Sequence, residues 1–468
     1  MARNNISLKQ VEVLGLADKG MSIGKDPTGV VVFVEGVVPG DIVDVKVLRK
    51  KRGYYQGIPK RFIKHSTSRQ TPPCQHFGEC GGCKWQNLNY QRQLQEKERI
   101  VKDAFERIAK VEVGTSLPIL AAPDIYHYRN KMEFSFSNQR WRSRSEIESD
   151  VKVPAQALGL HPPRFFNKVV DIEQCLLMHP FNDEIRNFVR DYARQKNLTF
   201  YDPKQHIGFL RNMILRTTTQ GEWMQIMSFG YDDEQERNEL LVALQERFTQ
   251  ITSLHYVINK KKNDTIFDQD VILAFGQPTI VENLGTLKYQ IRPKSFFQTN
   301  STQAKRLYDV VKEFAALNSS DVVYDLYTGT GSIALYLAAE CRIIVGVEEV
   351  EDAIEDAKEN AKLNNLSNAH FYVGDVKNVF QESLLQNHGK PDVLVTDPPR
   401  AGMHEKVCES IIDAVPGKIV YISCNPATQA RDIQRLSEKY QVAKIQPIDM
   451  FPHTHHIENV ALLTRKSR

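Results

Sequence analysis

The sequence lacks the features that mark membrane and extracellular proteins. Among its 468 residues, no run of apolar residues is long enough to span a bilayer. The N-terminus shows no basic segment followed by an apolar stretch, so we expect no signal peptide. The seven cysteines form no even disulfide framework. These absences predict a cytoplasmic protein in a reducing compartment, without membrane contact.

Acidic residues are scarce in the N-terminal part of the chain. Residues 1–73 hold 13 Lys or Arg but only 6 Asp or Glu, and residues 45–73 hold nine basic residues and no acidic one. The net charge of the whole chain is only +4. A basic module on a near-neutral chain favours a polyanion as partner, because clustered cations attract phosphates. A solvated charged face is the alternative, and we favour a nucleic acid over it.

The same segment alternates short strand patterns with turn residues. We expect four strands, at residues 10–14, 30–34, 41–48 and 54–63. This pattern predicts a small antiparallel barrel. The aromatic residues Tyr54, Tyr55 and Phe62 stand among its basic residues. Rings beside cations are the combination that binds single-stranded RNA.

Three of the cysteines stand unusually close together. Cys74 and Cys80 are separated by five residues, and a Gly-Gly pair separates Cys80 from Cys83. This spacing indicates a metal centre, because the glycines let the backbone wrap around it, and Cys175 is a candidate fourth ligand. Four thiolates can hold zinc or an iron–sulfur cluster, and the spacing leaves both open. Unligated core cysteines are the remaining alternative.

The C-terminal part alternates buried strands with helices. We expect strands at residues 322–327, 343–348, 371–375, 392–397, 419–422, 443–447 and 460–464. The pattern predicts a doubly wound α/β sheet, which binds ligands at the carboxyl ends of its strands. Cys424 stands at such an end, because Asn425-Pro426 stops the strand 419–422. Cys424 is therefore either a nucleophile or a small buried thiol.

A glycine turn after the first of these strands indicates a ligand that contains a ribose. Gly329 and Gly331 lead into a helix, and Glu348 ends the next strand 21 residues after Tyr327. Nucleotide-binding α/β units present a carboxylate to ribose hydroxyls at this distance. The glycine fingerprint of dinucleotide folds is incomplete, and Asp325 would repel a pyrophosphate. We therefore favour S-adenosylmethionine, which carries no phosphate, over a dinucleotide.

Four motifs occur in an order that resembles the RNA 5-methyluridine methyltransferase family. They are residues 325–331 (DLYTGTG), 397–402 (DPPRAG), 423–428 (SCNPAT) and 456–458 (HIE). Residues 11–47 resemble a TRAM domain, an RNA-binding barrel. With this segment and the cysteine trio, the chain resembles the ribosomal-RNA branch of the family, which carries a [4Fe–4S] cluster. The resemblance covers nearly the whole chain and is weakest at about residues 185–290.

The resemblance implies a role for each candidate site residue. Cys424 matches the nucleophile and Glu458 the general base. The positions that contact the cofactor are matched by Gln298, Tyr327, Ser332, Glu348, Asp375 and Asp397. The cluster ligands are matched by Cys74, Cys80, Cys83 and Cys175, which favours an iron–sulfur cluster over zinc.

Together these patterns predict an α/β protein of three domains. We expect a TRAM-like, OB-like barrel at residues 1–66, a central α+β domain with the iron–sulfur site at residues 67–290, and a Rossmann-like class I methyltransferase domain at residues 291–468. The expected activity is methylation of C5 of a uridine in 23S rRNA through a covalent cysteine–C6 adduct, with no obligate protein partner.

Several alternatives differ from this activity in substrate or in chemistry. The same reaction on tRNA and a non-catalytic RNA-binding assembly factor are two of them, although the second would be expected to have lost Cys424 or Glu458. An adenine N6-methyltransferase would have an aromatic residue in place of Arg400 and needs no cysteine nucleophile. A zinc-bearing oxidoreductase would need the complete glycine fingerprint.

Overall fold

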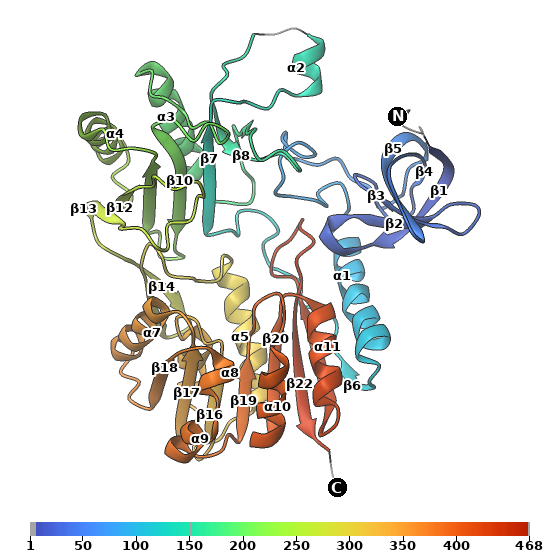
Figure 1. Ribbon diagram of the computed structural model, residues 1–468, viewed down its shortest axis with the longest axis vertical. Coiled ribbons are helices and arrows are strands. Elements are labelled where there is room, and N and C mark those ends of the chain that lie inside the picture. The colour runs from blue at the N-terminus through green and yellow to red at the C-terminus, as the bar shows by residue number, and fades with distance from the viewer. Residues whose placement is uncertain (1–5, 150–151, 467–468) are drawn as a thin grey trace.

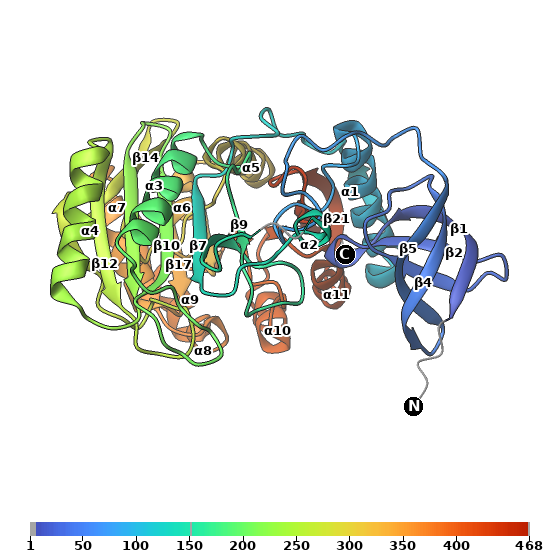
Figure 2. The same ribbon diagram turned by 90° about the horizontal axis from the view of Figure 1, so that it is seen from above.

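The computed structural model describes residues 6–149 and 152–466, and Figure 1 shows three units in it. The blue N-terminal barrel lies on one side, the green central sheet above, and the orange and red C-terminal sheet below. Seen from above in Figure 2, the barrel lies at one end of the molecule and α4 at the other. No helix of the described residues is long and apolar enough to cross a membrane.

Five strands close into the N-terminal barrel, in the order β1-β2-β3-β5-β4. They are β1 (Ser7–Leu16), β2 (Ser22–Lys25), β3 (Val31–Val34), β4 (Ile42–Lys51) and β5 (Tyr54–Lys64), with a short 3-10 turn η1 (Asp18–Gly20) after β1. Alternation along the strands buries a valine core, which includes Val11, Val32 and Val43. The barrel is confirmed, but it contains one more strand than predicted. The prediction of purely antiparallel pairing is wrong, because β3 pairs with β5 in parallel.

The segment after the barrel adds one strand to the C-terminal sheet. It forms α1 (Tyr90–Ala104), the π-helical turn η2 (Phe105–Ala109) and β6 (Val113–Ser116). Strand β6 pairs in parallel with β21 (Tyr440–Ile448) and thereby forms an edge of that sheet. The chain thus contributes to the C-terminal sheet before it enters the central one.

The central unit is a seven-stranded sheet in the order β13-β12-β11-β10-β7-β8-β9. Its strands are β7 (Lys131–Ser137), β8 (Ala157–Leu160), β9 (Val170–Asp171), β10 (Leu210–Thr217), β11 (Trp223–Phe229), β12 (Ile251–Ile258) and β13 (Ile272–Gly276). Its helices are α2 (Arg144–Glu148), α3 (Phe181–Gln195) and α4 (Glu234–Arg247). One face of the sheet packs against α3 and α4. A hairpin of β14 (Ile280–Leu284) and β15 (Leu287–Ile291) follows.

The C-terminal unit is an eight-stranded sheet in the order β18-β17-β16-β19-β20-β22-β21-β6. Its remaining strands are β16 (Val322–Leu326), β17 (Ile343–Glu348), β18 (Ala369–Val373), β19 (Val393–Thr396), β20 (Lys418–Ser423) and β22 (Glu458–Arg465). Its helices are α5 (Ser301–Ala315), α6 (Ser332–Ala338), α7 (Glu351–Leu363), α8 (Val376–Val379), α9 (Glu382–His388), α10 (Glu405–Ala414) and α11 (Pro426–Leu436). Strands β16 to β20 are parallel, and buried clusters on both faces confirm the predicted doubly wound sheet.

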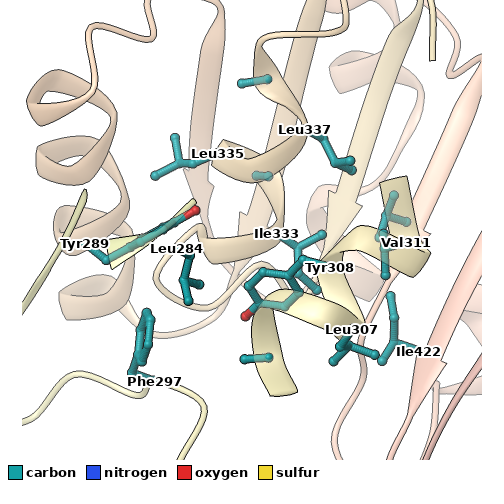
Figure 3. Packing of buried hydrophobic residues seen from close by; sticks show 14 of the residues in the cluster. Leu284, Tyr289, Phe297, Leu307, Tyr308, Val311, Ile333, Leu335, Leu337 and Ile422 are labelled. Atoms are coloured by element: carbon teal, nitrogen blue, oxygen red, sulfur yellow. The ribbon is translucent and has the colours of Figure 1, made fainter. Parts of the chain in front are cut away.

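One apolar cluster joins the central and C-terminal units. Ile214 and Ile226 of the central sheet belong to the same cluster as residues of α5 and α6. Figure 3 shows side chains from β14, β15, α5, α6 and β20 that meet in it, among them Leu284, Tyr289, Leu307, Ile333 and Ile422. Because this core is continuous, the carboxyl ends of the C-terminal strands are fixed relative to the central sheet.

Candidate active site

A single cavity of about 1210 Å³ lies at the carboxyl ends of the C-terminal strands. All eight predicted catalytic and cofactor positions line it: Gln298, Tyr327, Ser332, Glu348, Asp375, Asp397, Cys424 and Glu458. They come from segments up to 160 residues apart, from Gln298 to Glu458. The central sheet closes the other side of the cavity with His255 and Leu273. The predicted cysteine centre does not line this cavity.

The glycine turn after β16 holds the carboxylate of Glu348 in place. The N–H of Gly329 donates to Oε2 of Glu348 at 3.1 Å, and the N–H of Val350 donates to Oε1 at 3.1 Å. Gly331 has a φ of +74°, and a Cβ there would lie 2.9 Å from the side chain of Ala357. This position therefore requires glycine. The turn presents a fixed carboxylate at the strand end, where a ribose would bind.

Asp325 adds a second acidic group to the cavity wall. Its Oδ2 accepts a hydrogen bond from the Thr328 hydroxyl at 2.6 Å, whereas its Oδ1 is buried without a hydrogen-bond partner in the described chain. Burial raises the pKa of Asp325 to about 7. A buried acceptor without a partner suits a donor from a ligand. Two carboxyl groups and no basic phosphate-binding group in this turn fit S-adenosylmethionine, with its ribose hydroxyls and cationic groups.

Cys424 lies directly after β20. Asn425 and Pro426 then turn the chain into α11, as predicted. The side chain of Asn425 accepts a hydrogen bond from the N–H of Ala427 at 3.1 Å and caps α11. Burial, together with the charges of Glu458 and Asp397, raises the pKa of the Cys424 thiol to about 11. The charge of Arg400 and its hydrogen bond to the sulfur act in the opposite direction. Arg400 is thus the group that stabilises the thiolate.

Sequence reasoning missed Arg400 as a member of the site. Its carbonyl accepts hydrogen bonds from Asn425 Nδ2 at 3.0 Å and from Thr428 Oγ1 at 3.2 Å. Its guanidinium donates to Nδ1 of His456 at 3.0 Å. The start of α11 therefore clamps the loop beside the thiol. Arg400 belongs to the motif at residues 397–402 and His456 to the motif at residues 456–458. The occurrence of both motifs in one chain was the sequence signal that could have indicated this contact.

Two carboxyl groups face the thiol from neighbouring strands, the buried one of Glu458 and the half-buried one of Asp397. Glu458 is 6% exposed, and burial, with the charge of Asp397, raises its pKa well above the usual range. Burial and the charge of Asp325 raise the pKa of Asp397 to about 7. A carboxyl with a raised pKa is suited to take up a proton near neutral pH. The site therefore contains a nucleophile, a cation beside it and a candidate base.

The four predicted metal-ligand cysteines lie near one another, and two of them, Cys83 and Cys175, pack against the core of the central sheet. Burial raises the pKa of Cys80 and of Cys83 to about 12 each, and the charges of the neighbouring thiolates, Cys74 and Cys175, contribute to both shifts. In residues 6–149 and 152–466, no group of three or more Cys, His, Asp or Glu side chains is arranged to hold one metal ion.

The donor set nevertheless fits an iron–sulfur cluster. Four thiolates around one zinc ion would stand about 3.8 Å apart, given Zn–S bonds of about 2.3 Å. Each ligand of a [4Fe–4S] cluster binds a different iron, so the four sulfurs are farther apart. The four thiols lie close enough to influence one another's pKa, and cysteine thiolates are the ligands that such a cluster uses.

The barrel presents cations next to aromatic rings on its surface. Nζ of Lys50 lies 5.7 Å from the ring centroid of Tyr55, and Nζ of Lys51 lies 5.9 Å from that of Tyr54. Both rings are partly exposed on β5. Stacking surfaces beside basic groups suit the bases and phosphates of single-stranded RNA.

Two family models match the sequence. The model described as tRNA (uracil-5-)-methyltransferase matches residues 214–466, and the TRAM domain model matches residues 4–60. The first match contains every residue of the cavity discussed above, and the second contains most of the barrel.

Similar proteins cover nearly the whole chain. An uncharacterized RNA methyltransferase of Bacteroides thetaiotaomicron is 47% identical over 96% of this chain and 99% of its own length. One of Porphyromonas gingivalis is 46% identical over 98% and 100%. Among solved structures, the Pyrococcus abyssi tRNA (uracil-54, C5)-methyltransferase in complex with S-adenosyl-L-homocysteine has a TM-score of 0.74 and 28% identity, covering 97% of this chain and 100% of its own.

Proposed function

The chain belongs to the tRNA (uracil-5-)-methyltransferase family, and we propose that it transfers a methyl group from S-adenosylmethionine to C5 of a uridine in 23S ribosomal RNA. It is an S-adenosylmethionine-dependent RNA (uracil-C5)-methyltransferase. The observation that best supports the proposed mechanism is that the Cys424 thiol, Arg400 and the buried Glu458 line one cavity with the Glu348 carboxylate.

The first step is the addition of Cys424 to the substrate. C5 of uracil is a poor nucleophile, so the thiolate forms a bond to C6 and the electrons of the C5–C6 double bond move toward C5 and O4. Arg400 favours the thiolate form that this bond requires. The target base must leave its stack to reach a half-buried thiol, so a folded RNA loop is a better substrate than a duplex.

The next steps transfer the methyl group and restore the double bond. S-adenosylmethionine, when bound, supplies an electrophilic methyl group, and Glu348, Gln298 and Asp325 would hold it in line with C5. The electron pair at C5 forms the new C–CH₃ bond while the bond between that methyl group and the sulfonium sulfur breaks, and the electrons of the broken bond stay on sulfur, which leaves as S-adenosylhomocysteine. Glu458 then takes the C5 proton, the C–H electrons restore the C5–C6 double bond, and the bond between C6 and Cys424 breaks.

A second candidate is the same reaction on tRNA. The matching family model names tRNA in its description, and the Pyrococcus abyssi relative acts on uracil 54 of tRNA. The combination of barrel and four cysteines supports the ribosomal RNA instead, because it resembles that branch of the family. A non-catalytic RNA-binding role has no support from the site, since both Cys424 and Glu458 are present in the cavity.

Mapping of 5-methyluridine distinguishes the two substrates. A strain that lacks this gene should lose the modification from 23S rRNA and keep it in tRNA. A plasmid copy should restore it, whereas a Cys424→Ala copy should not. Loss from tRNA alone would contradict the proposed substrate and favour the second candidate.

We also propose that Cys74, Cys80, Cys83 and Cys175 hold a [4Fe–4S] cluster. Protein purified without oxygen should contain about four iron and four sulfide per chain, with the broad visible absorption of such clusters. Cys80→Ser should lose this absorption. Cys408→Ala should retain it, because Cys408 is buried in α10, outside the four-cysteine group. Stoichiometric zinc without sulfide would rule out the cluster.

A further inference from the structure

The loop between β21 and β22, residues 449–457, is held from three sides. Its first residue, Asp449, forms a fully buried ion pair with Lys97 of α1 at 2.5 Å and accepts a hydrogen bond from the Tyr90 hydroxyl at 2.8 Å. From the start of α5, Nδ2 of Asn300 donates to the carbonyl of Met450 at 3.0 Å. The loop ends directly before Glu458, the first residue of β22, which pairs with Ile448 of β21 at the start of the loop, so the loop closes on the residue that carries the carboxyl group.

His453 lies in the middle of this loop and contacts both α1 and the segment after Cys83. It is 0% exposed and has a φ of +65°, a conformation that is unfavourable for a non-glycine residue. Its N–H donates to Oε1 of Gln93 at 3.0 Å, and its ring Nδ1 pairs with Nε2 of the same Gln93 at 3.1 Å. The ring stacks on Tyr126 with centroids 4.5 Å apart. Tertiary contacts thus hold His453 in a strained conformation.

The same contacts connect His453 to the four-cysteine centre. Its carbonyl accepts hydrogen bonds from the N–H groups of Lys84 at 2.9 Å and Trp85 at 3.1 Å, the two residues that follow Cys83. Its stacking partner Tyr126 lies beside the centre, since burial and the charges of Cys83 and Cys74 raise its pKa.

Tyr128 makes a second contact with the same loop. The hydroxyl of Tyr128 donates to the carbonyl of Pro452 at 3.0 Å. Burial, with contributions from the charges of Cys83 and Cys175, raises the pKa of this tyrosine. Residues beside the cysteine centre therefore contact two successive residues of the loop, Pro452 and His453.

The loop also reaches the cavity and the loop that carries Arg400. His456 accepts the hydrogen bond from Arg400, and Phe451 lines the cavity. We propose that His453 is a positioning residue for the general base, and that it links the four-cysteine centre to the loop that carries Glu458. This role rests on the proposed function, in which Glu458 removes the C5 proton. It also gives the centre a purpose, which is to hold the base side of the active site in place.

Replacement by glycine separates this role from a mere effect on folding. Glycine adopts the positive φ without strain, so His453→Gly removes the ring contacts and relieves the backbone. We expect kcat to fall about 10- to 100-fold, the scale of a misplaced catalytic group, with unchanged KM values for RNA and S-adenosylmethionine. Covalent protein–RNA adduct should accumulate during turnover. His453→Asn should recover most of the rate, because asparagine tolerates this φ and can still bond to Gln93.

Hydrogen exchange of the backbone amides tests the link between the four-cysteine centre and the loop without a measurement of activity. Residues 449–458 should exchange faster in His453→Gly and also in Cys83→Ser. His206→Gly is a matched control, because His206 has a φ of +59° and contacts a tyrosine, Tyr201, at 3.2 Å, outside the cavity. It should leave both kcat and the exchange of the loop unchanged.

Three outcomes would overturn the proposal. They are unchanged exchange of the loop in His453→Gly, faster exchange without a fall in kcat, and a loss that appears only in the KM for RNA. Failure of the proposed function is read separately from Glu458→Gln, which leaves the contacts of His453 intact. If that variant releases product at the normal rate, Glu458 is not the base, although the exchange result for the loop would still stand.

Discussion

Replacing Glu458 with glutamine should convert the enzyme into one that stalls as a covalent adduct with methylated RNA. The amide keeps the shape of the side chain but cannot accept the C5 proton efficiently, so the bond between C6 and Cys424 cannot break. Addition and methyl transfer come earlier and should still occur. We expect the rate of product release to fall by about 10²- to 10⁴-fold, the usual contribution of a positioned base. The adduct should appear as a protein–RNA band that survives denaturation.

A substrate analogue provides the reference for this adduct. RNA that contains 5-fluorouridine should trap the unaltered enzyme at the same stage, because fluorine cannot leave C5 as a proton does. The two adducts should therefore have the same mobility and both should contain the transferred methyl group. Release of methylated RNA by Glu458→Gln at the normal rate would show that another group takes the proton.

Replacing Cys424 with alanine should abolish methylation and adduct formation together. The nucleophile acts before the methyl group is transferred, so no later step can proceed without it. Loss of a catalytic nucleophile lowers kcat by on the order of 10⁴- to 10⁶-fold. Methyl transfer from labelled S-adenosylmethionine and the denaturation-resistant band measure the two effects. Binding of S-adenosylmethionine should persist, because Glu348 and the glycine turn are unchanged.

A second cysteine of the C-terminal unit, in the turn between α6 and β17, serves as the control. Cys341 is buried at 7% exposure and does not line the cavity, so Cys341→Ala should methylate normally. Alkylation of Cys424 in the free enzyme should become faster as the pH rises toward its pKa of about 11, because the thiolate is the reactive form. An adduct formed by Cys424→Ala would identify a different nucleophile.

Local sequence signals predicted most strands of the C-terminal sheet and the edge at which its cavity lies. The strands 322–327, 343–348 and 419–422 are short apolar runs between turn residues, and such runs are buried almost regardless of context. The glycine turn and the Asn425-Pro426 stop are also local signals, because backbone conformation restricts which residues can stand there. These local signals placed Cys424 and Glu348 at the correct edge of the sheet.

The pairing partners of several strands follow from the packing of the whole chain and not from local patterns. Strand β6 is mostly exposed and lacks an apolar alternation, so nothing in residues 113–116 indicates that it pairs with β21. Likewise β2 has only four residues, too few to give a periodic pattern. The parallel pairing of β3 with β5 depends on how the barrel closes, which no single strand encodes.

Contacts between residues far apart in the sequence also decided parts of the active site. Arg400 lies beside Cys424 because the start of α11 clamps its loop through two side-chain hydrogen bonds, and a contact across 24 residues leaves no spacing signal. The hydrogen bonds of Lys84, Trp85 and Gln93 to His453 join segments about 360 residues apart in the sequence. Local patterns reflect backbone and burial preferences, whereas contacts of this kind depend on the packing of the whole chain.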